Sequence, residues 1–594
     1  MFQQQCLIAQ PCACANAPRV KHSTPKPAGP RTFDELHSAL SNAITNDIIV
    51  LTQNITEPAG YNWVPVQIKD NVTIRGNYHS VGLPNDQARQ LGAPLLGDGS
   101  SAISGLTVEN LSVYVHMPDA PATYPAKPIG AFARAVVNST FTNCAAYGLI
   151  SQVGDKIGGL VGSATGTTAF TNCANSAAVT GKEYVGGIVG YAVGTPILKG
   201  CANSARIDGT NRTGGIAGLT TNANITNCSN SGSVSTSAAR AAGIVSETDN
   251  CLVSGCLNSG EISGGGDIAG IVSVAVNGTP PQHTTIVSCK NTGNIYTKQT
   301  TVAVYFGGIV ANLGDNNVVN RCINTGSIND PDVWQCDLCH IVGGIVGSAE
   351  GGSRVIDSIN EGDVYSGADT SGSASVGGIV GVVPQHQNRV YITGNKNKGS
   401  VTGGGSNAGG IVGVSVNNVT ISNNIVSGKN VKITGSANVG GIVGSVQKES
   451  ADPVAAIVAN NRIGDLSLIT TAGGTTAHVH RIIGDYNPTD VNYWLLVETN
   501  YAEPKVVLTG DNTTLPVYDF NAKVSPPGIG ITYNNAAVAN NDPDLGANRL
   551  NGANRELPQP RTNSCIPVMD VCCRSTQAKA NCQKLNINCI CFNR

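Results

Sequence analysis

A short glycine-rich segment recurs ten times along this 594-residue chain and constrains its fold more than any other feature. Its regular form is Gly-Gly-Ile-Val-Gly, as at Gly186 to Gly190, and in two copies Ala replaces the first Gly. The copies begin at residues 158, 186, 214, 242, 269, 307, 343, 377, 409 and 440. The first five begin 27 or 28 residues apart, and the later intervals are 31 to 38 residues. Such a period predicts a solenoid with one structural unit per interval and insertions at its corners.

Each unit contains three short segments with the alternation of a β-strand. The glycine-rich segment is followed by a stretch that ends in Asn-Cys-x-Asn, as at Asn172 to Asn175, and then by Gly-x-Val or Gly-x-Ile, as at Gly232 to Val234. Segments of this length bounded by Gly or Asn are typical of strands and too short for helices. We therefore predict an all-β fold, a parallel β-helix with three strands in each roughly triangular coil.

If equivalent strands pair in register at the ~4.8 Å spacing of a parallel sheet, the repeated Cys residues stack in one column and the repeated Asn residues in a second. Asn tolerates the left-handed backbone of a corner, and stacked amides can hydrogen-bond along a column, so we expect the Asn residues at a turn and the Cys residues just inside it. We interpret the Cys column as small buried side chains, because free Cys is usually buried and Ser358 replaces it in a later unit. A metal or redox array is the alternative. The ladder residues are Cys173, Cys201, Cys228, Cys256, Cys289 and Cys322, with Asn175, Asn203, Asn230, Asn258, Asn291 and Asn324.

Composition argues against two classes of partner. Charged residues make up 12% of the chain and the net charge is -2, without any Lys/Arg cluster, so neither nucleic acid nor an anionic membrane surface is expected to bind. No apolar run reaches the ~18 residues of a transmembrane segment. The start of the chain lacks the apolar stretch of a recognisable signal peptide, so we expect either a leader already removed or an export route without one.

The two ends of the chain differ from the repeat region. Phe33, Leu36 and Leu40 have helical spacing, and Thr32 with Glu35 forms a capping-box pattern, which predicts a short helix that covers the first coil. We expect six segments: an exposed Cys- and Pro-containing tail at 1–30, the capping helix and irregular first coils at 31–140, the repeat β-helix at 141–480, terminal strands and a cap at 481–533, a linker at 534–563 and a small disulfide-rich tail at 564–594.

Cysteines outside the columns are interpreted mainly as disulfide partners. Six lie close together near the end of the chain, in a piece too short to bury them in a core, so a disulfide-stapled tail is expected. Zinc is the alternative there, although the tail contains no His. The single CxxC is interpreted as a loop with its own disulfide rather than a redox or metal motif. Cys6, Cys12 and Cys14 could instead cross-link copies of the chain. The disulfide candidates are Cys565, Cys572, Cys573, Cys582, Cys589, Cys591, Cys336 and Cys339.

The repeat unit resembles the GLUG motif family, whose Gly-Leu/Ile-x-Gly signature is seen here as Gly159-Leu160-Val161-Gly162 and in its Gly-Ile-Val-Gly-like relatives. The resemblance covers about residues 140–480. It implies a right-handed parallel β-helix of the kind found in large surface and adhesin-like proteins. It implies no catalytic residues.

No residue pattern points to catalysis. Parallel β-helices also serve as polysaccharide lyases and hydrolases, which need calcium-binding carboxylates with a basic residue, or two to three acids on adjacent coils. We find no acid that recurs at one position of consecutive units, so no catalytic, cofactor-binding or metal residue is assigned and no cofactor is expected.

Our first hypothesis is therefore a non-enzymatic structural or adhesive solenoid, as a fibre, an adhesin or a virion surface component. It would be extracellular, on a cell or virion surface, and would contact a glycan, a surface receptor or other copies of itself. A polysaccharide-cleaving lyase or glycosidase is the alternative.

Overall fold

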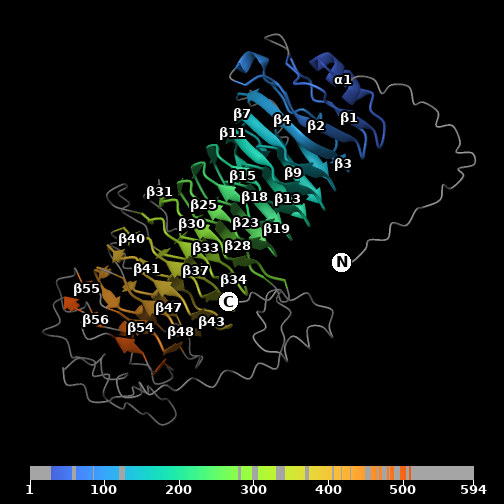
Figure 1. The fold of residues 1–594 in the computed structure, drawn as a ribbon. Coiled ribbons are helices and arrows are strands. Elements are labelled where there is room, and N and C mark those ends of the chain that lie inside the picture. Colours follow the sequence, from blue (N-terminus) through green and yellow to red (C-terminus); the bar gives the residue numbers. More distant parts are fainter. Residues whose placement is uncertain are drawn as a thin grey trace, which may run out of the picture. The chain divides into compact units, whose positions relative to one another are not determined.

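The protein is a parallel β-helix. The computed structural model describes residues 29–509 apart from 57–61, 85, 119–127, 279–281, 298–304, 330–340, 368–373, 405–406, 417, 429, 448–455, 465–466, 471–477, 481, 487–494, 499 and 503–506. Within these residues the strands of successive coils lie side by side, in chain order from blue to orange in Figure 1. The predicted all-β solenoid with one helix near its start is confirmed. The terminal cysteines and the CxxC lie outside the described residues.

One coil contains five short strands rather than the three predicted. The Gly186-Gly187 pair separates the first two strands, and a corner at Gly200, with a φ of +63°, separates the third from the fourth. Each glycine turn divides a segment that reads as one continuous strand in the sequence. The strands of this coil are β12 (Glu183–Gly186), β13 (Val189–Gly194), β14 (Ile197–Lys199), β15 (Ala202–Asn203) and β16 (Ile207–Gly209).

Every coil pairs in parallel with the next, and equivalent residues of the repeat are register partners. Strands equivalent to β12 form an 11-stranded sheet from β8 (Asp155–Gly158) to β56 (His478–His480). Strands equivalent to β13 form a 13-stranded sheet from β3 (Ile103–Ser104) to β57 (Ile483–Tyr486). Val272 pairs with Val310 even though the interval between these two copies is among the longest, so the insertions lie outside the paired segments.

The stack begins at helix α1 (Phe33–Ser41). Its N-cap Thr32 accepts a hydrogen bond from the Glu35 backbone N–H at 3.1 Å, as the capping-box pattern predicts. Phe33, Leu36 and Leu40 are buried and belong to the same hydrophobic core as the coils. Figure 1 shows α1 at the blue end beside β1 (Ile48–Val50), where a solenoid would otherwise expose its core. The described residues contain no helix with the length and hydrophobicity that a membrane span needs.

The glycine motif is required by close backbone approaches. A Cβ on Gly187 would lie 2.2 Å from the Gly215 carbonyl oxygen of the next coil and 2.7 Å from the side-chain carbon of Asn203. A Cβ on Gly190 would lie 2.6 Å from the Ile157 amide nitrogen of the preceding coil. The Gly-Gly pair and the Asn column therefore depend on each other, because the second glycine makes room for the Asn of its own coil.

Candidate functional site

Buried asparagines form a continuous hydrogen-bonded ladder through eight coils. Each side-chain Nδ2 except that of the last residue, Asn397, donates one hydrogen bond to the Oδ1 of the next Asn at 2.7–2.9 Å. All eight donate to the backbone carbonyl two residues further along their own coil, at 2.8–3.0 Å. Along the ladder before Asn397 both amide hydrogens are thus used, which is what burial of a polar group requires. The ladder consists of Asn175, Asn203, Asn230, Asn258, Asn291, Asn324, Asn360 and Asn397.

These asparagines do not occupy the left-handed corner that we expected for them. The residue with positive φ stands one position before the Cys, as in Asn172 with a φ of +52° and Asn227 with a φ of +54°. The ladder asparagines instead lie in strands and are at most 1% exposed. Their amides point into the interior, where only the neighbouring amides and carbonyls can satisfy them.

The column cysteines are buried and carry free thiols. Cys173 and Cys201 each point their Sγ atoms at a backbone carbonyl of the preceding coil, at 3.4 Å from Phe141 O and Phe170 O. Burial raises the pKa of the Cys144 thiol well above its ordinary value. Contacts with the neighbouring thiols, together with burial, do the same to the pKa of Cys201. Hydrogen bonds from the flanking thiols instead lower the pKa of Cys173 and Cys228. The column is buried throughout and its thiols point at backbone carbonyls, so it is arranged for packing.

The described cysteines contain no disulfide, and one of them lies outside the column. They are Cys144, Cys173, Cys201, Cys228, Cys251, Cys256, Cys289 and Cys322. Cys251 stands at a different corner, where its Sγ lies 3.5 Å from the Thr220 hydroxyl.

A second asparagine ladder, which sequence reasoning missed, continues the Cys column. After Cys322 the column holds Ser358 and then four buried asparagines, whose Nδ2-to-Oδ1 hydrogen bonds are 2.9–3.1 Å long. The first ladder ends at Asn397, which is followed by Val426, so the amides change columns along the stack. The signal was an Asn at the Cys position, directly after the corner residue. The second ladder consists of Asn395, Asn424, Asn461 and Asn500.

The outer faces of the two sheets that flank the Gly-Gly turn carry a partly buried charge network. Arg212 contacts Glu183 and Glu247, the latter at 2.7 Å from its Nε, and Arg240 also contacts Glu247. Asp155 and Glu183 are register partners on adjacent coils, so our statement that no acid recurs at one position is wrong. The signal was present in the sequence, since each of these two acids stands three residues before the first glycine of its repeat.

Aromatic side chains extend this network toward the first coils. Tyr184 and Tyr191 meet edge to face with ring centroids 5.3 Å apart, and the Lys156 ammonium lies 4.3 Å from the Tyr191 ring centre. The Arg212 guanidinium lies 5.2 Å from the Tyr184 ring centre. Burial raises the pKa of the Tyr184 hydroxyl, so this phenol stays protonated and available as a hydrogen-bond donor. We call the side chains of Lys156, Glu183, Tyr184, Tyr191, Arg212 and Glu247 the tyrosine face.

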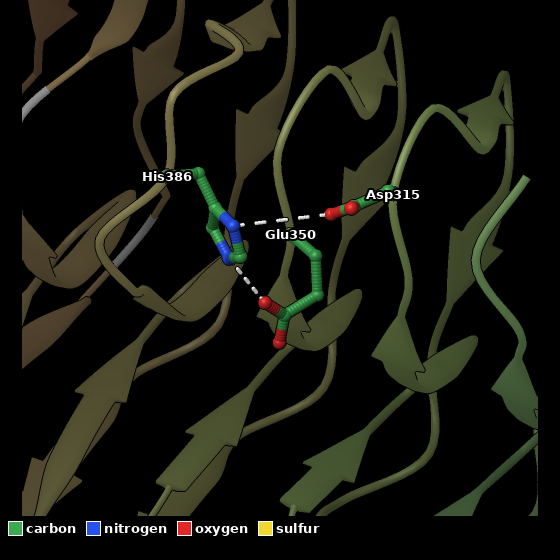
Figure 2. Close-up of side chains that lie close together, drawn as sticks. All are labelled: Asp315, Glu350 and His386. Carbon is green, nitrogen blue, oxygen red and sulfur yellow. Dashed lines mark hydrogen bonds and ion pairs between the residues drawn. The ribbon is translucent and has the colours of Figure 1, made fainter. Parts of the chain in front are cut away.

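A third group brings together two carboxylates and one imidazole from three successive coils. Figure 2 shows the His386 ring between the two acids, with Nδ1 toward Asp315 and Nε2 toward Glu350. The Nδ1-to-Oδ1 distance to Asp315 is 3.9 Å, and Nε2 is in contact with Glu350. These residues follow β33 (Val310–Leu313), β37 (Val346–Ala349) and β42 (Val380–Val383).

Unequal spacing conceals this group in the sequence. Asp315, Glu350 and His386 stand eight, seven and nine residues after the first glycine of their own repeats, at 307, 343 and 377. An alignment of the repeats on the glycine pair therefore puts them in different columns. Only the folded corners bring them to one place.

These features define the chain as a repeat protein of the parallel β-helix class, with tandem coils in register over a core of small and branched side chains. Residues 209–235 match the family model described as the GLUG motif, and this segment contains one of the ten glycine-rich copies. This match and the repeated coils together fit a GLUG-repeat β-helix, which is the fold that the resemblance implied. None of the curated proteins matches the chain.

Proposed function

We propose that the protein is a non-enzymatic, surface-displayed solenoid with a structural or adhesive role. The observation that carries the proposal is the regular register of the repeat coils, reinforced inside by two ladders of hydrogen-bonded amides. A stack of this kind resists bending and local opening because each coil is bound to both neighbours along its length. Its lateral faces are then free to present binding groups at fixed spacing.

The tyrosine face is the described surface that best suits an adhesive contact. Aromatic rings with a polar end and Arg groups are enriched at binding surfaces, because they combine apolar area with directed hydrogen bonds. GLUG repeats occur in large surface proteins, which supports an extracellular location and a glycan, a receptor or another copy of the chain as the partner.

A binding screen of the full chain on glycan and cell-surface arrays tests this proposal. We expect saturable binding that Tyr191→Ala weakens and that Tyr391→Ala, a change at an exposed tyrosine on another sheet, leaves unchanged. The proposal is rejected if the chain binds no array component and no copy of itself at micromolar concentration.

A second candidate, cleavage of a polysaccharide, is favoured by one specific observation. Glu183 and Glu247 flank Arg212 on coils that are close in the stack, which resembles the acid pairs and basic residues of carbohydrate-active β-helices. Both acids are ion-paired, which favours the structural interpretation. Incubation with acidic and neutral polysaccharides distinguishes the two functions. Turnover that Glu183→Gln or Glu247→Gln abolishes, and that Glu361→Gln does not, would establish the enzyme.

A further inference from the structure

The group formed by Asp315, Glu350 and His386 has the composition of a metal site. One ligand atom from each side chain lies within 4.8 Å of the other two. Around a tetrahedral Zn²⁺ ion with bonds of about 2.0–2.2 Å, two ligand atoms lie about 3.3–3.6 Å apart. Side-chain adjustments of about 1–1.5 Å would therefore bring all three atoms around one ion.

We propose that Asp315, Glu350 and His386 bind one divalent transition-metal cation, with Zn²⁺ as the preferred ion. Imidazole favours Zn²⁺ and its neighbours in the first transition series over Ca²⁺ and Mg²⁺, which prefer all-oxygen sites. Three protein ligands would leave the remaining position for water. The ion would join three successive coils at one corner of the solenoid.

The Asp315 carboxylate provides an independent reason for a cation. Its Oδ1 atom, the one that faces His386, is buried and accepts no hydrogen bond. Among the described residues, neither Asp315 nor Glu350 forms an ion pair with Lys or Arg. Two carboxylates therefore meet with only an imidazole between them. The Asp315 side chain as a whole is 33% exposed, so this oxygen lies at the edge of the site, where a bound cation would supply the partner that it lacks.

Neighbouring residues position two of the three ligands, Glu350 and His386. The Glu350 N–H donates to the Leu313 carbonyl at 2.9 Å, and the Ser348 hydroxyl donates to Glu350 Oε1 at 2.9 Å. A Cβ on Gly351 would lie 2.9 Å from the His386 Cβ, so only glycine lets this histidine approach. Ligands fixed by their surroundings in this way are typical of metal sites, where supporting groups orient the ligands.

The test measures metal binding to the full chain after treatment with a chelator and dialysis. Free thiolates are also good Zn²⁺ ligands. Co²⁺ is therefore used as a second probe, since an oxygen-and-nitrogen site lacks the near-ultraviolet charge-transfer band of a Co²⁺-thiolate site. We expect one thiolate-free Co²⁺ per chain and a Zn²⁺ affinity that His386→Gln and Asp315→Asn each weaken at least tenfold. Glu361→Gln, which changes an exposed carboxylate paired with Lys398, is the matched control.

Gly351→Ala separates a positioned site from a loose collection of side chains. It retains all three ligands but displaces His386, so we expect it to weaken Zn²⁺ binding while far-ultraviolet circular dichroism stays unchanged. Thermal unfolding should shift upward with Zn²⁺ in the parent chain and the control, and much less in the ligand variants. The proposal is overturned if no thiolate-free Co²⁺ binds, or if folded His386→Gln and Glu361→Gln bind Zn²⁺ with equal affinity.

Discussion

Replacement of Asn230 by Ala in the middle of the first ladder tests the amide stack directly. Asn230 is fully buried and takes part in three side-chain hydrogen bonds. Its Nδ2 donates to Asn258 Oδ1 and to Gly232 O, each at 2.8 Å, and its Oδ1 accepts from Asn203 Nδ2 at 2.7 Å. The substitution leaves two acceptors and one donor without these partners in a dry interior.

The expected loss follows from the cost of unsatisfied buried groups. Each stranded donor or acceptor costs about 1–3 kcal/mol, and partial relaxation makes the three costs less than additive. We therefore expect Asn230→Ala to lower the free energy of unfolding by about 3–6 kcal/mol. Coils are coupled mainly to their neighbours, so the damage should concentrate at β15, β20 (Ser229–Asn230) and β25 (Leu257–Asn258).

Chemical unfolding and hydrogen exchange with mass spectrometry measure these two effects on the full chain. Asn224→Ala is the matched control, because Asn224 is an exposed residue of the same coil, in β19 (Asn224–Thr226). An exposed substitution of this kind changes stability by about 0.5 kcal/mol or less. If the two variants unfold at the same denaturant concentration, or if exchange rises equally in distant coils, the argument for the ladder is wrong.

Three further predictions concern the glycine motif, a buried thiol and the tyrosine face. Gly187→Ala should destabilise the fold by at least about 3 kcal/mol, because its Cβ would meet the Gly215 carbonyl oxygen. Gly92→Ala is the control, since no atom lies within 4 Å of the added Cβ, and it should leave the melting temperature unchanged when both variants are compared by thermal unfolding. Burial raises the pKa of the Cys251 thiol, which lies outside the column, so this thiol contributes stability that is complete below the unfolded-state thiol pKa of about 8.5 and is lost as pH rises above it, by up to about 1.36 kcal/mol per pH unit; an equal loss of stability between pH 7.5 and 9.5 in the parent chain and in Cys251→Ser would contradict this. Arg212→Ala should lower the free energy of unfolding by about 1–2 kcal/mol, because it removes a partly buried partner from Glu183 and Glu247. High salt should reduce this difference from the parent chain. A loss that salt does not change would show that packing rather than charge is responsible.

The solenoid itself could be predicted from particular local signals. The constant interval between glycine pairs determines that one copy stacks on the next, and the short alternating segments determine that the stacked elements are strands. Thr32 and Glu35 predict the start of the helix because a capping box needs only neighbours in sequence. Even the long interval before Gly307 does not disturb the pairing, since backbone hydrogen bonds depend on the paired segments and not on the length of the corners.

The side-chain groups depend on distances that no local pattern contains. Asn395 continues a column of thiols only because the corner before it has the same conformation as the corner before Cys322. Glu247 reaches Arg212 across the turn of a glycine pair, and His386 reaches Asp315 across two coils whose corners differ in length.

The sequence by itself therefore determined the architecture, the direction of pairing and the composition of the core, because all three follow from a repeated local pattern and from backbone hydrogen bonding. The tertiary structure alone decided which asparagines share hydrogen bonds and which charges meet. It also decided that two acids and a histidine lie at one corner. Side chains meet through space, and the path of each corner sets how far they reach.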